Sequence, residues 1–338
     1  MTKKQRIDAF ANLGDYLRSD TPQLAQTVES AYRNNPWFTP ANIHRALEAI
    51  AANLSSDRLH EWLAPYPFND DIDKTVGLVL AGNVPLVGFH DILCVLAAGF
   101  NVQVKTATVD PALTPHLLEK LQEIEPGFTS KIKVTDRLAD FDLIIATGSD
   151  NSSRYFSYYF GRKPHIIRKN RNSAAVLTGT ESMNEIRLLG NDIFDYFGLG
   201  CRNVSKLFVP EGYDPSTFFQ GIAAFGHIIN HHKYANNYDY NKSIYLINGD
   251  QHFDNGFLLL KPDERNASPL GVVYLETYQT HDKLHQRLNE LAPQLQCVVS
   301  QLPLPIATPV VGFGNSQQPA LDDYADGVDT LGFLAAHR

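Results

Sequence analysis

The stretch Val76-Gly77-Leu78-Val79-Leu80 is a continuous apolar run, as expected for a strand buried on both faces of a sheet. A helix is predicted over 86–98, and a second strand follows at Val102-Gln103-Val104-Lys105. A further helix is expected over 115–124 and another buried strand over 141–146. Strands and helices that alternate at this length predict a parallel, Rossmann-like α/β sheet, although the usual GxGxxG fingerprint is missing.

Helices are expected before this sheet and a second α/β unit after it. Thr21-Pro22 and Thr39-Pro40 are typical of N-caps followed by first-turn prolines. Beyond His165 we expect a helix over 181–197, strands at 174–177, 206–209, 243–247 and 272–274, and a polar loop at 236–241. The predicted organisation is a helical N-terminal arm (1–70), a Rossmann-type cofactor-binding domain (71–165), a smaller catalytic α/β domain (166–312) and a C-terminal segment that packs back on the core (313–338).

Composition narrows the class of protein. Of the 338 residues, 43% are hydrophobic and 20% are charged, and the net charge of -8 argues against a nucleic-acid partner. No stretch approaches the ~18 consecutive apolar residues of a membrane span. Three cysteines cannot all pair and match no zinc motif, which indicates a reducing compartment and no metal. Because no apolar run follows the N-terminus, we expect a cytoplasmic protein. We also expect the protein to form a homo-oligomer.

One cysteine stands on a glycine-flanked bend, Phe197-Gly198-Leu199-Gly200-Cys201-Arg202-Asn203, between a predicted helix and an apolar strand. Helical N–H groups or a backbone nest at such a bend can stabilise a thiolate, the nucleophilic form of the side chain. A single cysteine among aliphatic residues is also typical of a buried small hydrophobe, so both interpretations of Cys201 stay open here. Cys94 is expected in the core and Cys297 in a strand.

Polar residues stand where the predicted strands end, the edge at which open α/β sheets bind ligands. Asn83 follows the first strand and could donate its amide to a developing oxyanion, or merely cap the next helix. Lys105, followed by Thr106, ends the second strand and suits a ribose hydroxyl or a 2′-phosphate, although a solvated lysine is common there. Thr147-Gly148-Ser149 follows the next buried strand, and backbone N–H groups in such a turn suit a pyrophosphate.

These signals, in this order and followed by Cys201, resemble the aldehyde dehydrogenase superfamily over about 75–209. That family has a strand ending in a catalytic Asn before a proline, a strand ending in Lys, a Thr-Gly-Ser turn and then the nucleophilic Cys. Within the superfamily the chain is most similar to the LuxC-like acyl-CoA reductases. That closer resemblance rests on Gly82-Asn83-Val84-Pro85, the run Gly198-Leu199-Gly200-Cys201-Arg202-Asn203-Val204-Ser205, and 323–329 near the C-terminus.

The resemblance implies an aldehyde-dehydrogenase-like fold and a reductase of acyl-CoA, with fatty acyl groups as the expected substrates. An aldehyde would form through a Cys201 thioester and a hydride from NADPH, with no metal. The implied site residues are Cys201 as nucleophile, Asn83 for the oxyanion, Lys105 and Thr106 for the cofactor ribose or its 2′-phosphate, Thr147, Gly148 and Ser149 near the pyrophosphate, and Glu276 for the nicotinamide ribose. An acyl-transferring synthetase is the implied protein partner.

One departure from the family pattern is informative. Ordinary aldehyde dehydrogenases carry a glutamate before the nucleophile that activates water, whereas Arg168 stands at that place here and no Glu or Asp occurs over 151–180. Without that base, water attack on an acyl-enzyme should be slow, which favours a CoA-dependent reductase. A conventional NAD(P)-dependent dehydrogenase with another base, and a non-catalytic acyl-carrying scaffold, are the alternatives.

A histidine group is the remaining candidate site. His227, His231 and His232 contain an i, i+4 pair that could ligate a metal if it lay on one helix. Because no third ligand stands at useful spacing, the prediction is an ordinary polar helix.

Overall fold

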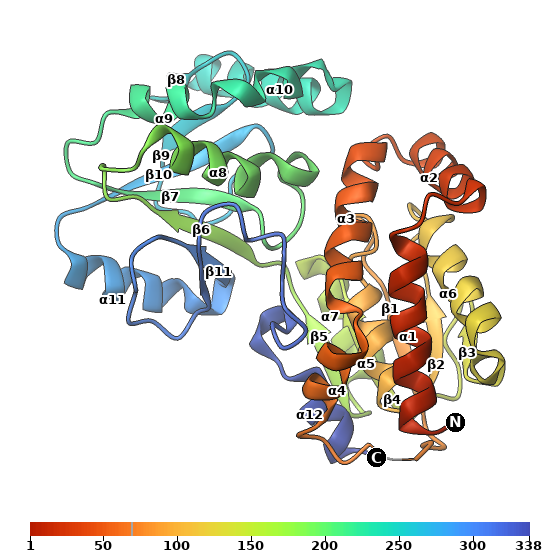
Figure 1. The fold of residues 1–338 in the computed structure, drawn as a ribbon. Helices are drawn as coiled ribbons and strands as arrows, with labels where there is room; N and C mark the ends of the chain where they lie inside the picture. Colours follow the sequence, from red (N-terminus) through yellow and green to blue (C-terminus); the bar gives the residue numbers. More distant parts are fainter. Residues whose placement is uncertain (69) are drawn as a thin grey trace. The chain divides into compact units, whose positions relative to one another are not determined.

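The computed structural model describes residues 1–68 and 70–338, which divide into two compact units (Figure 1). The first unit is Met1–Asn170 with Ala320–Arg338, and the second unit is Arg171–Pro319. The division therefore lies at 170 rather than 165. The expected N-terminal arm is not a separate domain, because its helices share one hydrophobic core with the first sheet. Of the C-terminal segment, 320–338 packs in the first unit and 313–319 in the second.

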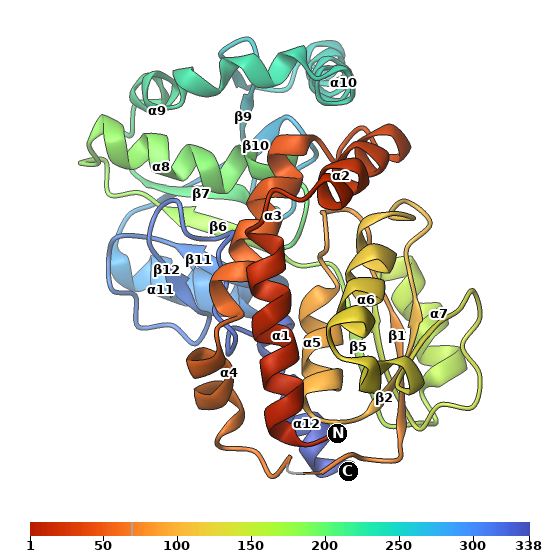
Figure 2. The ribbon, with the colours of Figure 1, turned by 45° about the vertical axis from the view of Figure 1, so that its right-hand side comes forward.

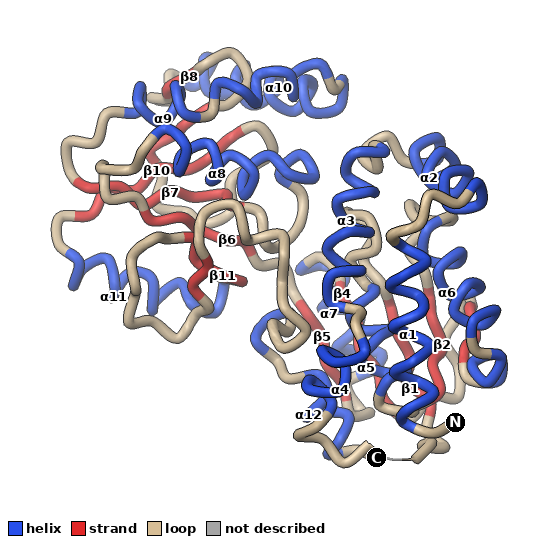
Figure 3. The backbone as a smooth tube through the Cα atoms, in the orientation of Figure 1, coloured by secondary structure: helices blue, strands red, loops and turns tan. Residues whose placement is uncertain are grey.

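The first unit contains a five-stranded parallel sheet in the order β3-β2-β1-β4-β5. Its strands, drawn in red in Figure 3, are β1 (Thr75–Val79), β2 (Asn101–Lys105), β3 (Ile132–Val134), β4 (Leu143–Thr147) and β5 (His165–Arg168). The predicted Rossmann-like sheet is confirmed. The second domain was expected to begin near His165, but the segment there forms β5 and pairs in parallel with β4, a non-local contact that its sequence does not reveal.

The helices of the first unit cover both faces of this sheet. They are α1 (Lys3–Leu17), α2 (Pro22–Asn34), α3 (Pro40–Asn53), α4 (Ser56–Leu63), α5 (Phe89–Ala97), α6 (Leu113–Ile124), α7 (Asp150–Phe160) and α12 (Thr330–Ala336), with short 3-10 turns η1 (Pro126–Ser130) and η5 (Ala325–Gly327). Leu143 and Ile145 belong to the core that α1, α5 and α6 share (Figure 2), whereas Ile144 and Ala146 pack with Phe156 of α7. This alternation is the period of two expected of a strand buried on both faces.

The N-terminal helices begin where the sequence predicts. The Oγ1 atoms of Thr21 and Thr39 each accept a backbone N–H at 3.3 Å, and a proline follows each at the first helical position. The C-terminal segment is tied to these helices, since Trp62 Nε1 of α4 donates to the Tyr324 hydroxyl at 3.0 Å. The arm is therefore part of the scaffold beneath the first sheet.

The second unit contains a seven-stranded sheet in the order β12-β11-β6-β7-β10-β9-β8, parallel except for the β8–β9 pair. Its strands are β6 (Asn172–Val176), β7 (Val204–Pro210), β8 (Phe253–Asp254), β9 (Leu259–Pro262), β10 (Val272–Tyr278), β11 (Leu295–Val299) and β12 (Val310–Val311). Its helices are α8 (Met183–Phe194), α9 (Pro215–Gly221), α10 (His232–Asn248) and α11 (His281–Leu291), with 3-10 turns η2 (Asp195–Gly198), η3 (Ala223–Asn230) and η4 (Ala292–Gln294). Figure 1 shows α8 and α11 on opposite faces of this sheet.

Helix α10 corrects two predictions, the strand at 243–247 and the polar loop at 236–241. Its buried positions are Tyr234, Tyr238, Asn241 and Tyr245, spaced at 4, 3 and 4 residues as one face of a helix requires. The helix was not predicted because its buried face consists of tyrosine and asparagine rather than aliphatic residues. The buried asparagine is satisfied, since its Nδ2 donates to the carbonyl oxygen of Leu270 at 2.9 Å.

Candidate functional site

The carboxyl ends of three strands meet at one edge of the first sheet. In the parallel register Val79 of β1 lies beside Lys105 of β2 on one side and Ala146 of β4 on the other. Since β2 and β4 flank β1 on opposite sides, this is the point at which the strand order reverses. Open α/β sheets bind ligands at that point. The loops that carry Asn83, Lys105 and Thr147 therefore all leave from the expected edge.

Asn83 lies in the loop between β1 and α5, and its side chain is exposed. The alternative that it caps the next helix is wrong, because α5 begins at Phe89 with Gly88 as its N-cap and no side-chain cap. Among the described residues no hydrogen bond uses the Asn83 amide. Gly82 allows the loop to pass close to the segment after β2, since a Cβ at this position would lie 2.4 Å from Ala107 Cβ. The structure thus leaves an exposed amide at the sheet edge.

Lys105 and the Thr147-Gly148-Ser149 turn provide groups that suit a phosphate. Lys105 is exposed at the end of β2, where its Nζ donates to the Asp136 carbonyl oxygen at 3.0 Å. Ser149 is the N-cap of α7, so the turn places the positive end of an 11-residue helix beside it. Thr106 and Thr147 are half-buried beside these groups.

Gly148 keeps the backbone of this turn open. A Cβ there would lie 2.8 Å from Ser152 Cβ and 2.9 Å from Phe156 Cε2, closer than side-chain atoms approach. A glycine is therefore required for the turn to sit directly on the head of α7. This is the local geometry in which backbone N–H groups receive an anion.

Arg168 ends β5 and is buried, with 4% of its surface exposed. Its Nη1 donates to Asp91 Oδ2 at 2.5 Å, its Nη2 donates to Thr330 Oγ1 at 3.1 Å, and the register places it beside Thr147. Burial lowers the pKa of the guanidinium but Asp91 more than restores it, so the net direction of the pKa shift is upward. The position that the family resemblance aligns with a general base thus holds a fixed, charged cation.

Cys201 lies in the second unit, in the loop between η2 and the first residue of β7. The chain reaches it through four left-handed residues: Tyr196 (φ 53°), Phe197 (φ 60°), Gly198 (φ 80°) and Gly200 (φ 98°). The two non-glycine residues in this region each cost about 1–2 kcal/mol of backbone strain. Strain of this kind persists only where the surroundings enforce it, and it clusters at functional sites.

The surroundings of the Cys201 bend enforce its shape. Ser173 Oγ donates to the Cys201 carbonyl oxygen at 3.0 Å, and the Ser173 N–H donates to the Asn203 carbonyl oxygen at 3.0 Å. The ring of Phe197 lies on the ring of His231, with 4.1 Å between the ring centroids. Neither Ser173 nor His231 was predicted to support the bend, because each reaches it from a distant part of the sequence and belongs to no local motif.

Burial separates the three cysteines, none of which forms a disulfide. Cys94 and Cys297 have no exposed surface, as predicted for a core residue and a strand residue, whereas Cys201 is half-buried. The interpretation as a buried small hydrophobe therefore fits the other two cysteines better than Cys201. The nucleophilic role of Cys201 is taken up below as a proposal.

Alkylation under mildly alkaline, native conditions is expected to modify Cys201 first. Burial raises the pKa of the Cys94 thiol well above its usual range, so Cys94 stays protonated and unreactive at that pH. Cys94 and Cys297 should react at least about 100-fold more slowly, since alkylation there requires local opening. Peptide mass spectrometry after timed iodoacetamide treatment measures the three rates. Equal rates at Cys94 and Cys201 would contradict this assignment of burial.

Glu276 lies in a different unit from the other predicted cofactor residues. It lies on β10 in the second unit, whereas the others lie on the first sheet. Its carboxylate pairs with Lys206 Nζ, which has no exposed surface, and accepts Arg287 Nε at 2.8 Å. The structure thus gives Glu276 a structural ion-pair network, and its contact with a ribose stays a prediction.

The three histidines do not lie on one helix, which corrects the expected i, i+4 face. η3 ends at Asn230, His231 is the N-cap of α10 and His232 is the first residue of α10. His227 instead contacts the Ala224 carbonyl oxygen through Nδ1 at 3.0 Å. In residues 1–68 and 70–338 no group of three His, Cys, Asp or Glu side chains is placed to hold a metal ion.

No protein-family model matches the sequence, and no curated protein matches it either. Solved structures match it in fold. Aldehyde dehydrogenase 21 from Physcomitrella patens, in complex with the reaction product succinate, matches with a TM-score of 0.72 and 15% identity over 99% of this chain and 84% of that chain. The indole-3-acetaldehyde dehydrogenase AldA of P. syringae, in complex with NAD+, gives a TM-score of 0.69 and 12% identity over 93% of this chain and 77% of that chain.

Betaine aldehyde dehydrogenase from Staphylococcus aureus, also in complex with NAD+, matches with a TM-score of 0.65 and 13% identity over 92% of this chain and 75% of that chain. The chain therefore has the aldehyde dehydrogenase fold, as its sequence predicted. Identities this low establish the fold alone. None of the helices in the described part of the chain combines the length and apolarity needed to cross a bilayer.

Proposed function

We propose that the chain is an acyl-CoA reductase with fatty acyl substrates, which uses Cys201 as nucleophile and NADPH as reductant. The Cys201 thiolate attacks the thioester carbonyl, the C–S bond to CoA breaks and CoA leaves as a thiolate that takes up a proton. Reduction of the resulting acyl-enzyme by two electrons and one proton, delivered as a hydride, gives a hemithioacetal anion, whose C–S bond breaks to release an aldehyde and restore the Cys201 thiolate.

The first unit supports a dinucleotide. Lys105 and Thr106 are the candidates for its ribose or 2′-phosphate, and Thr147, Gly148 and Ser149 for its pyrophosphate, because Gly148 keeps the head of α7 open to an anion. When bound, the dinucleotide supplies the hydride. The solved structures of similar fold that hold NAD+ support a nicotinamide cofactor, and the choice of NADPH rests on the family resemblance.

Arg168 is the single observation that favours a reductase over an acid-forming dehydrogenase. Its guanidinium is held by Asp91 and Thr330, so it neither accepts a proton from water nor moves aside at low cost. The two acids nearest downstream are also occupied: Glu181 accepts the Thr178 N–H at 2.6 Å, and Glu185 caps α8. With no base in this segment, hydrolysis of an acyl-enzyme is slow and reduction becomes its exit.

Replacing Asn83 by alanine is expected to lower the rate of CoA release by about 10²–10³-fold, the usual cost of one oxyanion donor. Because the Asn83 side chain is exposed and caps no helix, the variant should fold normally. Single-turnover release of CoA, followed with a thiol reagent, measures this effect. Asn289→Ala, which removes an exposed asparagine on α11, is the matched control. Retention of nearly full rate by Asn83→Ala would remove Asn83 from the proposed mechanism.

The proposed function is tested by incubating the protein with a long-chain acyl-CoA and NADPH while absorbance and thiol concentration are recorded together. Equimolar NADPH oxidation and CoA release support the reductase. CoA release without NADPH oxidation indicates acyl transfer to another acceptor, the chemistry expected beside an acyl-transferring synthetase. Absence of both signals across several chain lengths favours the scaffold alternative.

A further inference from the structure

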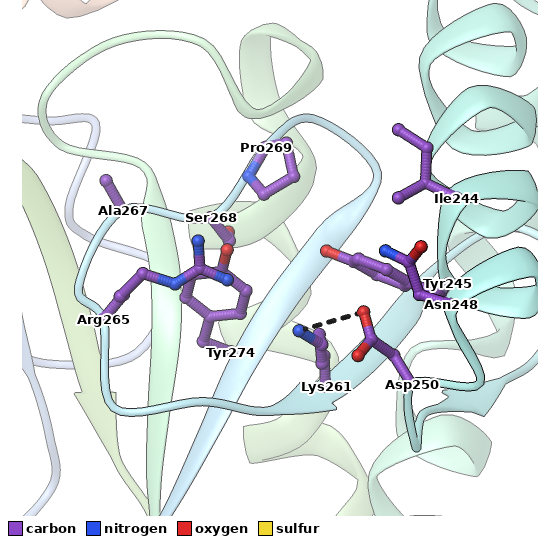
Figure 4. A pocket seen from close by; sticks show the side chains of 10 residues that line it. All are labelled: Ile244, Tyr245, Asn248, Asp250, Lys261, Arg265, Ala267, Ser268, Pro269 and Tyr274. Carbon is purple, nitrogen blue, oxygen red and sulfur yellow. Dashed lines mark ion pairs between the residues drawn. The ribbon is translucent and has the colours of Figure 1, made fainter.

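A groove in the second unit lies apart from the Cys201 bend. It has a volume of about 580 Å³ and opens between the end of α10, strand β9 and the loop 263–271 that leads into β10 (Figure 4). Its lining residues are Ile244, Tyr245, Asn248, Asp250, Lys261, Arg265, Ala267, Ser268, Pro269 and Tyr274. None of them belongs to the residues proposed above for catalysis or for the cofactor.

The loop on one side of this groove is held by a buried cation. Lys206 has no exposed surface, and its Nζ donates to the carbonyl oxygens of Asp263, Glu264 and Arg265 at 3.1, 2.9 and 3.1 Å. Ser205 Oγ donates to the Asn266 carbonyl oxygen at 2.9 Å. The hydrogen bonds from Lys206 and Ser205 therefore hold the backbone that carries Arg265 in place, as a preorganised binding site requires.

Four polar side chains, Lys261, Arg265, Tyr245 and Tyr274, converge on the groove. Lys261 Nζ lies 4.9 Å from the centroid of the Tyr245 ring, and Arg265 Cζ lies 5.1 Å from that of Tyr274. Figure 4 shows Lys261, Arg265 and Tyr245 reaching toward the same space. Both tyrosines are buried, and burial raises the pKa of each. Their hydroxyls are hydrogen-bonded to each other, so one hydroxyl proton is left to donate into the groove.

The nearby acids take up part of these donors, since Lys261 Nζ donates to Asp263 Oδ2 at 3.4 Å. Asp263 is committed to the loop itself, since it accepts Arg265 Nε at 2.9 Å, Arg265 Nη2 at 2.5 Å and the Arg265 N–H at 3.0 Å. Asp250 Oδ2 lies 3.5 Å from Lys261 Nζ, longer than a direct charge-assisted hydrogen bond. Among the described residues no hydrogen bond uses Arg265 Nη1. The groove therefore offers the remaining N–H of the Lys261 ammonium and one guanidinium nitrogen.

We propose that this groove binds a small phosphate monoester, with the phosphate between Lys261 and Arg265 and the organic part against Ile244 and Pro269. A phosphate accepts single hydrogen bonds from several directions, which suits separate donors on Lys261, Arg265 and one tyrosine. Asp263 occupies the Nε–Nη2 edge of Arg265, so a ligand in the groove meets Nη1 as one donor among several, which suits the tetrahedral oxygens of a phosphate. The site is independent of the proposed reductase activity.

Calorimetric titration of the full chain with phenyl phosphate tests this site. Saturable binding is expected, and Lys261→Gln should weaken it about tenfold or more, the effect of one charge-assisted hydrogen bond. Lys242→Gln is the matched control, because Lys242 also lies over a tyrosine ring and pairs with an aspartate but stands outside the groove. Its affinity should equal that of the unmodified chain, and circular dichroism checks the fold of both variants.

Three results would overturn the proposal: no saturable binding at millimolar phenyl phosphate, equal loss in both lysine variants, or tighter binding of phenylacetate than of phenyl phosphate. A further titration in the presence of saturating CoA separates two sources of the same chemistry. Displacement of the probe would identify the phosphate monoester carried by CoA itself as the occupant. Undisturbed binding would support a separate small phosphorylated ligand.

Discussion

Replacing Cys201 by alanine is expected to abolish CoA release from acyl-CoA, with a loss of at least about 10⁴-fold. Removal of a covalent nucleophile typically has an effect of this size, because neither the oxyanion donor nor substrate binding can substitute for the missing bond. Intact-protein mass spectrometry should detect the acyl adduct on the unmodified chain and none on the variant. The half-buried side chain of Cys201 leaves room for the reagent, and the strained bend holds it at the start of β7.

Cys94→Ala is the appropriate control for this experiment. Cys94 is fully buried in the core of the first unit, so its replacement removes a sulfur atom without touching the bend. It should cost some stability and leave the acyl adduct intact. An adduct that forms at the normal rate on Cys201→Ala but disappears in Cys94→Ala would reverse the assignment of the nucleophile.

Replacing Arg168 by methionine is expected to destabilise the chain by about 3–5 kcal/mol, the usual cost of breaking a buried ion pair by removing one partner. The variant would leave the Asp91 carboxylate, which is 6% exposed, without its cation. It would also remove the hydrogen bond to Thr330, which holds the C-terminal segment. Urea denaturation followed by circular dichroism measures the free energy of unfolding.

The double variant Asp91→Asn with Arg168→Met should be more stable than Arg168→Met alone, because no unpaired buried charge remains. Arg154→Met, at an exposed position of α7, should change the free energy of unfolding by less than about 0.5 kcal/mol. If Arg168→Met were as mild as Arg154→Met, the ion pair with Asp91 would not exist as described. Arg168 would then be available for another role.

The central strands of both units were predictable, because buried parallel strands appear in the sequence as apolar runs, whereas β3, β5, β8, β9 and β12 were not predicted. Val76–Leu80, Val102–Lys105 and Phe141–Ala146 correspond to β1, β2 and β4 within two residues at each end. Such apolar runs do not reveal the order in which the strands pair. β5 joins the first sheet through β4, and only that pairing moves the division between the units to 170.

The position of the candidate site was predictable from the sequence, but the residues that hold the Cys201 bend in place were less so. Glycines at 198 and 200 indicated a bend at Cys201, and the structure has both in the left-handed region. Tyr196 and Phe197 adopt the same region without any such signal, held by contacts such as the one with His231. Helix α10 was mistaken for a strand and a loop because tyrosines and a buried asparagine, rather than aliphatic residues, form its inner face.

The central claim is that an acyl-enzyme on Cys201 leaves by reduction and not by water attack. The most direct measurement prepares this acyl-enzyme from acyl-CoA, removes free CoA and follows its fate by mass spectrometry with and without NADPH. We predict a stable adduct in buffer alone and rapid discharge to aldehyde when NADPH is added. Rapid loss of the adduct in buffer, with the carboxylic acid as product, would contradict the account and indicate a dehydrogenase with another base.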